Sequence, residues 1–125
     1  MLRTIGQVEA EIGNALIQFE KDFMGRGPKE TRAYIIDDMV LVRLKGVLTP
    51  AEQQLAKNAA GTDLIKQIRS NLLEQARGLL SETIEEITGL KVISLYTDIS
   101  TRTGERVILF TLNEKLAERF RAGPA

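Results

Sequence analysis

The stretch that decides the fold is GRGPKETRAYIIDDMVLVRLKGVLTPAE, residues 25–52. It holds a glycine and proline corner, two apolar runs on either side of an acidic pair, and a helix start. Gly25 and Gly27 can adopt backbone dihedrals closed to other residues, and Pro28 disfavours the helical region for the residue before it. A helix that arrives from the N-terminal side should therefore end near Met24, and a β-hairpin should follow.

The hairpin is predicted over residues 29–45. Its two apolar runs meet at Asp37 and Asp38, residue types that favour turns. Alternation along the chain assigns one set of apolar residues to each face of the hairpin. The first set is Tyr34, Ile36, Val40, Val42 and Leu44, and the second is Ala33, Ile35, Met39 and Leu41. Because both sets are apolar, both faces of the sheet need cover.

Helical patterns flank this hairpin. Apolar residues recur at steps of three or four over residues 4–24, which predicts an amphipathic helix. Thr49 and Glu52 form a capping-box pattern around a proline, and a short helix is expected over residues 50–58. A longer helix is expected over residues 62–88. Its predicted apolar stripe is Leu64, Ile68, Leu72, Ala76, Leu79, Leu80, Ile84 and Ile87.

A second hairpin is predicted over residues 90–112, followed by a short helix and tail over residues 113–125. With 125 residues the chain fits one domain, residues 1–125, in the order α-β-β-α-α-β-β-α. We expect an α+β two-layer sandwich, in which two long helices cover one face of a four-stranded antiparallel sheet. The repeated order of elements indicates either an internal duplication or an ordinary α-β-β-α alternation.

The sheet face without helices should carry apolar side chains in water. The residues expected there are Ile35, Leu41, Val107 and Leu109. Exposed apolar patches larger than a few hundred Å² usually mark interaction surfaces. The sequence therefore predicts a homodimer, or another partner, that covers this face.

Composition excludes several classes of function. The chain has no cysteine, which removes thiolate nucleophiles, and no histidine, which removes the commonest transition-metal ligand and the commonest general base. We therefore expect no enzyme, no metal site and no cofactor. Lys plus Arg equals Asp plus Glu at 17 each, so no nucleic-acid partner is expected. No run approaches the length of a spanning helix, which favours a cytoplasmic protein without direct membrane insertion.

The glycine corner has two possible roles. Gly25, Arg26, Gly27 and Pro28 could form an anion-binding loop, in which backbone N–H groups converge and the guanidinium adds a donor. The corner could instead be a helix stop with a rigid turn. The spacing matches neither common phosphate-binding motif, so the helix stop is favoured.

Several short motifs occur together in order along the chain. They are Gly25-Arg26-Gly27-Pro28, the strand end at residues 34–38, the Leu-Thr-Pro-Ala-Glu segment at residues 48–52, Gly89-x-Lys91-Val92-Ile93, and Asp98-Ile99. In combination they resemble the MpsC-like family of small bacterial proteins, named after the third component of a sodium-translocating, membrane-potential-generating system. The resemblance covers about residues 5–112. It implies an accessory role beside membrane subunits that handle cations or inorganic carbon, and it supplies no catalytic residues.

Two functions from different classes follow. The first is a non-enzymatic cytoplasmic accessory or regulatory protein that acts as a homodimer through the exposed sheet face, with the Arg26 loop as a candidate contact to membrane transport subunits. The second is a sensor module that binds a small anion or nucleotide at the glycine corner and nearby arginines. An enzyme is least favoured, because no paired catalytic constellation appears at fixed spacing.

Overall fold

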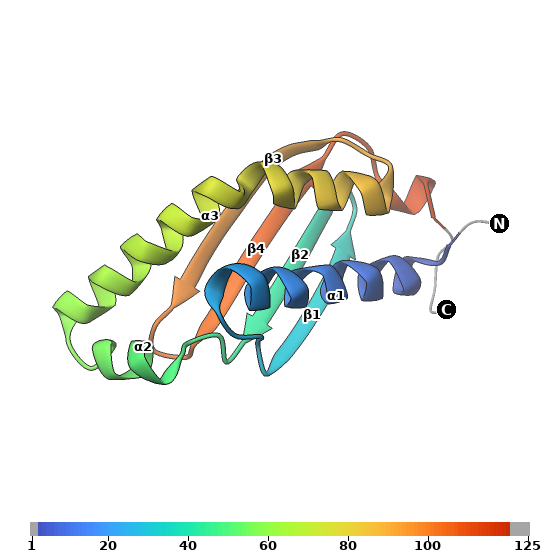
Figure 1. Cartoon of the computed structure of the whole chain (residues 1–125). Coiled ribbons are helices and arrows are strands. Elements are labelled where there is room, and N and C mark those ends of the chain that lie inside the picture. The colour runs from blue at the N-terminus through green and yellow to red at the C-terminus, as the bar shows by residue number, and fades with distance from the viewer. Residues whose placement is uncertain (1–2, 121–125) are drawn as a thin grey trace.

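The computed structural model describes residues 3–120, and the predicted tail at residues 121–125 lies outside them. The elements in chain order are α1 (Ile5–Met24), β1 (Glu30–Ile36), β2 (Met39–Lys45), α2 (Pro50–Leu55), α3 (Ala59–Thr88), β3 (Val92–Ser100), β4 (Glu105–Leu112) and the 3₁₀ turn η1 (Leu116–Glu118). The strands form one antiparallel sheet in the order β1-β2-β4-β3. Figure 1 shows α1 and α3 crossing one face of this sheet. The α+β class and the two-layer arrangement are confirmed.

The predicted cap chemistry explains where α1 and α2 begin and end. Thr4 Oγ1 accepts a hydrogen bond from the backbone N–H of Gln7 at the start of α1. Gly25 ends that helix with a φ of +88°, a left-handed conformation that glycine adopts without strain. At the start of α2, the backbone N–H groups of Thr49 and Glu52 are bound reciprocally by each other's side chains, at 2.9 and 3.2 Å. The capping box read from the sequence is therefore present.

The boundary between α2 and α3 lies earlier than predicted. The first helix ends at Leu55 rather than at residue 58, and the second begins at Ala59 rather than at residue 62. Asn58 caps α3, because its Oδ1 accepts a 2.7 Å hydrogen bond from the N–H of Gly61. A Cβ atom on Gly61 would lie 1.8 Å from the carbonyl oxygen of Leu55, so this close turn requires glycine.

The last predicted helix is only one turn long. At its start the side chain of Asn113 does not cap a helix, because its Oδ1 accepts a 2.9 Å hydrogen bond from the N–H of Lys91. The backbone N–H of Asn113 donates a hydrogen bond to the carbonyl oxygen of Lys91 at 3.0 Å. Asn113 thus ties the end of β4 to the start of β3, and only a 3₁₀ turn at Leu116–Glu118 follows.

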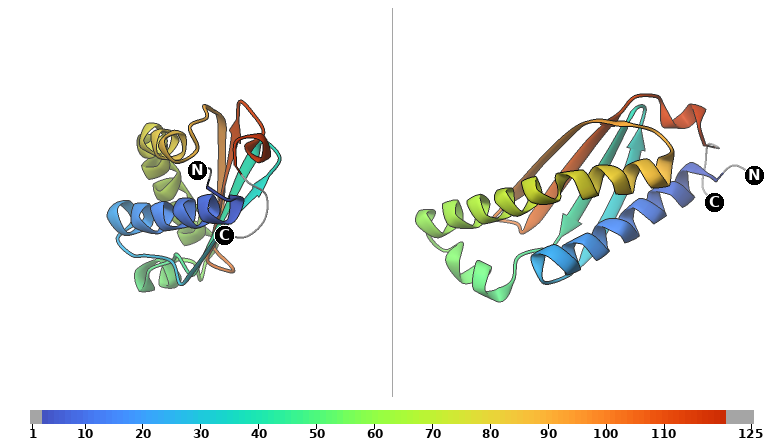
Figure 2. Two further views of the ribbon diagram at one scale, coloured as in Figure 1. Left: turned by 90° about the vertical axis from the view of Figure 1, so that its right-hand side faces the viewer. Right: turned by 45° about the horizontal axis from the view of Figure 1, so that its top comes forward.

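The apolar core lies between the helix layer and one face of the sheet. Figure 2 shows that the long helices cover this face only. On the sheet side the core is formed by alternate residues of β2, β3 and β4. On the helix side it is formed by residues of α1 and α3. Its fully or almost fully buried members include Val8, Ile12, Leu16, Val40, Val42, Leu44, Ile65, Leu73, Leu80, Ile84, Ile108 and Phe110. The other face of the sheet carries no helix.

The predicted apolar stripe of the long helix is wrong in its first half. The structure buries Ile65 and Leu73, whereas Leu64 and Ile68 are about half exposed. From Ala76 onward the predicted and observed stripes share Ala76, Leu80 and Ile84, but Leu79, which was also predicted on the buried stripe, is 47% exposed. The first half is rotated by one residue because the position between Ile65 and Leu73 on the buried stripe is held by a charged residue, Arg69.

The predicted faces of the first hairpin are also wrong for β1. Asp37 and Asp38 form a two-residue turn, and Ile36 pairs with Met39 across it. In that register Ile35 pairs with Val40, and both face the helices. The alternation was carried straight through the turn in the prediction, whereas a two-residue turn places odd-numbered residues of one strand opposite even-numbered residues of the other.

Candidate functional site

The glycine corner is a helix stop tied to the next loop. Gly25 has the left-handed conformation that ends α1, whereas Gly27 has a negative φ. The Arg26 guanidinium is engaged within the chain, because its Nη1 donates a hydrogen bond to the carbonyl oxygen of Leu48 at 3.2 Å. The corner therefore fastens the end of α1 to the loop between β2 and α2.

A basic hollow lies next to this corner. It measures about 420 Å³ and is lined by Lys29, Gly46, Leu48, Gln53, Ala56, Lys57, Thr101, Arg102, Thr103 and Gly104. Three of these residues, Lys29, Lys57 and Arg102, are cationic, and none is acidic. The hollow has the charge that a small anion requires, and it shares Leu48 with the contact of Arg26.

The open face of the sheet, meaning the face without helices, carries three full cross-strand rows, beyond which Glu30 pairs with Lys45 and Glu105 with Ser100. The central row reads Tyr34, Leu41, Leu109 and Tyr96 across β1, β2, β4 and β3. The row on one side of it reads Arg32, Arg43, Val107 and Asp98, and the row on the other side reads Ile36, Met39, Thr111 and Ser94. Three predicted interface residues, Leu41, Val107 and Leu109, thus lie on this face.

Ile35 does not belong to the open face. It lies on the helix-covered face beside Val40 and packs against the core. The residues of β1 that stand in its place on the open face are Tyr34 and Ile36, which are 38% and 48% exposed. Sequence reasoning missed them because it placed them on the covered face. That error arose from carrying the alternation through the two-residue turn at Asp37 and Asp38.

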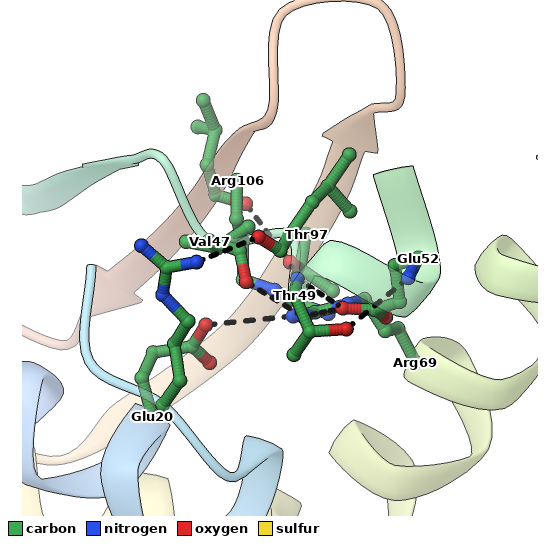
Figure 3. A network of polar contacts seen from close by, with 10 residues as sticks. Glu20, Val47, Thr49, Glu52, Arg69, Thr97 and Arg106 are labelled. Carbon is green, nitrogen blue, oxygen red and sulfur yellow. Dashed lines mark hydrogen bonds and ion pairs between the residues drawn. The ribbon is translucent and has the colours of Figure 1, made fainter. Parts of the chain in front are cut away.

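The helix-covered side contains a buried charge cluster, made of Glu20, Glu52, Arg69 and Arg106 (Figure 3). Arg69, from α3, forms a bidentate pair with Glu52, with Nε to Oε2 at 2.8 Å and Nη2 to Oε1 at 2.7 Å. Its Nη2 also donates to the carbonyl oxygen of Val47 at 2.9 Å, and its Nη1 lies 3.5 Å from Oε1 of Glu20. A single guanidinium thus joins α1, α2, α3 and the loop after β2.

The cluster is almost closed to water. Glu20 is 0% exposed, and Arg69 and Arg106 are each 2% exposed. Arg106, from β4, donates from Nη1 to Oγ1 of Thr97 at 3.2 Å. Both carboxylate oxygens of Glu20 and the Nε of Arg106 are buried without a hydrogen-bond partner in the protein. Glu20 is therefore held chiefly by the charges of the two arginines rather than by hydrogen bonds.

The two carboxylates of the cluster respond oppositely to their surroundings. Burial raises the pKa of Glu20 above its ordinary value of 4.5, although Arg106 and Arg69 act in the other direction. Burial acts to raise the pKa of Glu52 as well, but the hydrogen bonds from Arg69 and Thr49 outweigh it, and the pKa of Glu52 is lowered. The better-hydrogen-bonded carboxylate is the stronger acid.

Sequence reasoning missed the cluster although a signal for it was present. Glu20 lies four residues after Leu16 on the apolar side of α1, and Arg69 lies midway between Ile65 and Leu73. A charged residue at helical spacing within an apolar stripe indicates a buried charge that needs a partner. When an acid and a base occupy such positions on two helices of the same layer, the two are expected to pair with each other.

Metal ligands do not gather in the described part of the chain. Among residues 3–120 there is no group of three or more acidic side chains that could hold a metal ion. Asp37 lies at the β1–β2 turn, where Oδ1 is 3.8 Å from Nζ of Lys115, and Asp98 lies in a different row of the sheet on β3.

A second apolar surface lies on the helix layer. We call it the helix-layer stripe, and it consists of Phe23 of α1 with Leu64, Ile68 and Leu79 of α3, each between 42% and 47% exposed. Phe23 stacks on Phe19, with ring centroids 4.9 Å apart. A shallow groove of about 150 Å³ between α1 and α3 is lined by Phe19, Phe23 and Leu79, among others. Among the described residues, no helix is long and apolar enough to cross a membrane.

Comparisons with known proteins give a family and two relatives. A family model described as "Na+-translocating membrane potential-generating system (MpsC)" matches residues 4–114. The Bacillus subtilis (strain 168) protein YbcI, described as uncharacterized, is 46% identical over 112 residues, which cover 90% of each chain. YrhF of the same organism, also described as uncharacterized, is 25% identical over 110 residues, or 87% of this chain and 90% of YrhF. No solved structure gives a significant match.

Replacing Arg69 should destabilise the protein severely. Arg69→Met leaves the carboxylates of Glu20 and Glu52 in the interior without their main partner, and breaking a buried ion pair on one side costs about 3–5 kcal/mol. Urea denaturation should show this loss in the free energy of unfolding. Arg102→Met, in the exposed β3–β4 turn, is the matched control and should change it by less than about 0.5 kcal/mol. Recovery of part of the loss in Arg69→Met/Glu20→Gln would identify Glu20 as the stranded charge; equal effects at positions 69 and 102 would contradict a structural role for the cluster.

The raised pKa of Glu20 predicts a pH dependence with a definite sign. Because the folded protein binds the Glu20 proton more tightly than the unfolded chain, that proton stabilises the fold at low pH, and the contribution is lost as pH rises from 4.5 through the folded pKa. The free energy of unfolding of the wild type, minus that of Glu20→Gln, should therefore fall as pH rises over this window. Denaturation curves at several pH values measure the difference. A difference that rises with pH would mean that the arginines, and not burial, dominate at Glu20.

Proposed function

The chain belongs to the MpsC family, and from this premise we propose that it is a non-enzymatic accessory or regulatory protein of a membrane system that moves cations or inorganic carbon. The family description names a sodium-translocating, membrane-potential-generating system. In this proposal the protein acts in the cytoplasm as a homodimer and contacts a membrane subunit of that system. The observation that carries the proposal is the presence of two separate apolar surfaces, one on each layer of the fold.

The helix-layer stripe is the surface proposed for the membrane subunit. Leu64, Ile68 and Leu79 lie on one side of α3, at spacings of four and eleven residues, and Phe23 of α1 lines the same groove as Leu79. The buried side of α3 is already filled by the core, so this stripe is additional to what folding needs. Burying a half-exposed leucine or isoleucine stabilises a complex through the roughly 25 cal/mol gained per Å² of apolar surface removed from water. A helix of a partner that lies along α3 would bury all three.

A pull-down tests this accessory role. Tagged wild-type protein, expressed in cells that make such a transport system and recovered after mild solubilisation of the membrane, should carry a transport subunit with it. Leu64→Lys/Ile68→Lys should lose that subunit, because it places two charges in the proposed contact. Gln67→Lys adds a charge to an exposed position of α3 outside the stripe and should retain it. Absence of any transport subunit from the wild-type sample would refute the proposal.

A small-anion sensor is the second candidate, and the basic hollow is the observation that favours it. Lys29, Lys57 and Arg102 supply three cations around one space without a neighbouring acid in its lining. The anion would bind there and not in the backbone of Gly25 to Pro28, because the Arg26 side chain is engaged with Leu48. Such binding would link the α1–β1 corner, α2 and the β3–β4 turn.

Thermal denaturation with added anions tests the second candidate. Inorganic phosphate or ATP should raise the melting temperature of the wild type, since a ligand at one hundred times its dissociation constant adds about 2.7 kcal/mol to the free energy of unfolding. Lys57→Ala/Arg102→Ala should lose most of the shift. Arg32→Ala removes a cation from the open face, outside the hollow, and should keep it. An unchanged melting temperature with both compounds would count against a phosphate-type ligand at this site.

A further inference from the structure

The charges on the open face are divided between its two halves. On β1 and β2 the face carries Arg32, Arg43 and Lys45 against one acid, Glu30. On β4 and β3 it carries Glu105 and Asp98. Glu105 accepts a 2.7 Å hydrogen bond from Arg43 of the same chain, and Lys45 lies 3.6 Å from Glu30. Arg32 at one edge and Asp98 at the other, whose exposed carboxylate lies 3.7 Å from Lys66 of α3, are the charges that can reach a second copy, with the apolar row of Tyr34, Leu41, Leu109 and Tyr96 beside them. A surface divided in this way is complementary to itself.

We propose that two copies of this chain pack open face to open face, about a two-fold axis that runs parallel to the strands. This inference rests on the homodimer of the proposed function and specifies its geometry. A two-fold axis along the strands keeps each row in place and exchanges the two edges of the sheet. It therefore sets β1 over β3 of the second copy and β2 over β4 of the second copy.

The edges and the centre of the face then meet suitable partners. Arg32 faces Asp98 of the second copy, and by symmetry Asp98 faces the other Arg32. Arg43 lies over Val107 of the second copy and keeps its 2.7 Å hydrogen bond to Glu105 of its own chain. In the central row, Leu41 faces Leu109 and Tyr34 faces Tyr96, so leucines meet in the middle while the tyrosine hydroxyl groups reach the wetter rim. Aligned sheets cross at about 30°, which displaces the corners by about 5 Å, a distance that a long side chain such as Arg32 can span.

A two-fold axis across the strands is disfavoured by the same layout. It would set β1 over β1 and exchange the rows on either side of the central one. Arg32 would then lie over Ile36 instead of Asp98. Arg43 lies over an apolar residue about either axis, so Arg32 makes the difference. Covering a charged group with apolar side chains costs several kcal/mol when no partner is supplied. The division of charge therefore selects the axis along the strands.

The area is sufficient for a specific but concentration-dependent dimer. Four strands about 4.8 Å apart and seven residues long present a plan area on the order of 450 Å². Two copies would bury about 900 Å² in plan, and more when the corrugation of the side chains is counted, which approaches the lower end of specific interfaces. We expect a reversible monomer–dimer equilibrium.

Sedimentation velocity of the purified full chain, over a series of concentrations, tests the dimer. The wild type should shift from the mass of a monomer to that of a dimer as concentration rises. Leu109→Lys, at the centre of the open face, should stay monomeric, and far-UV circular dichroism should show that it is folded. Ile68→Lys, the same type of change on the helix layer, should dimerise like the wild type. A wild type that stays monomeric, or a dimer that Leu109→Lys leaves intact, would overturn the proposal.

Mixing two charge variants tests the axis. Arg32→Asp and Asp98→Arg should each weaken dimerisation by about tenfold or more, because each places two like-charged pairs in its own symmetric dimer. When the two variants are mixed, both pairs again join opposite charges, so the mixture should dimerise nearly as well as the wild type. Recovery cannot arise within one chain, because the two residues lie on opposite edge strands. A mixture that dimerises no better than its components would overturn the proposed axis. These measurements need no transport subunit, so their outcome is independent of the pull-down.

Discussion

The buried guanidinium of Arg69 is the contact on which the arrangement of the helix layer depends. It binds Glu52 through two hydrogen bonds, Val47 through one, and Glu20 through charge, so α1, α2 and the loop after β2 all meet at α3. A charge in the interior is tolerated only with partners in fixed positions. Apolar residues in place of the whole cluster could fill the same volume at less cost, but they would not fix the direction in which α2 and the start of α3 leave the sheet. We interpret the cluster as a device of specificity more than of stability.

The same cluster accounts for what the helix layer leaves exposed. Because the buried side of α3 passes through Arg69, the leucine and isoleucine at positions 64 and 68 are turned away from the core and become the helix-layer stripe. The sheet, covered by helices on one side only, keeps its second apolar face. The two surfaces therefore have different origins, one from a rotated helix and one from an uncovered sheet. They lie on opposite layers, and two partners could occupy them at once.

Local signals in the sequence predicted most of the fold, and non-local pairing explains where prediction failed. The capping box at Thr49 and Glu52 and the stop at Gly25 depend on neighbouring residues, and both are present. The stripe of α3 was misassigned because Arg69 interrupts its apolar pattern, and the partner Glu20 that accounts for this charge lies on another helix, far away in the sequence. Ile35 was misplaced because the facing of two strands depends on the length of the turn, which the alternation of either strand does not reveal. The division of charge on the open face likewise requires the strand order, since Arg32 and Asp98 are far apart in the sequence.

Both edges of the sheet are partly protected, which explains why association should use its open face instead. An edge strand offers unpaired backbone groups to other chains, and natural sheets usually protect it. On β1 the outward N–H of Ile35 donates to the carboxylate of Glu9 on α1, at 2.9 Å. On β3 the carbonyl oxygen of Leu95 accepts from Arg77 at 3.0 Å, and the N–H of Val92 donates to Glu85 at 3.0 Å, both from α3. The helices thus occupy both edges with their own side chains, and an edge-to-edge pairing would have to break these bonds. The open face requires no such exchange, because covering it removes apolar side chains from water and leaves the backbone pairing intact.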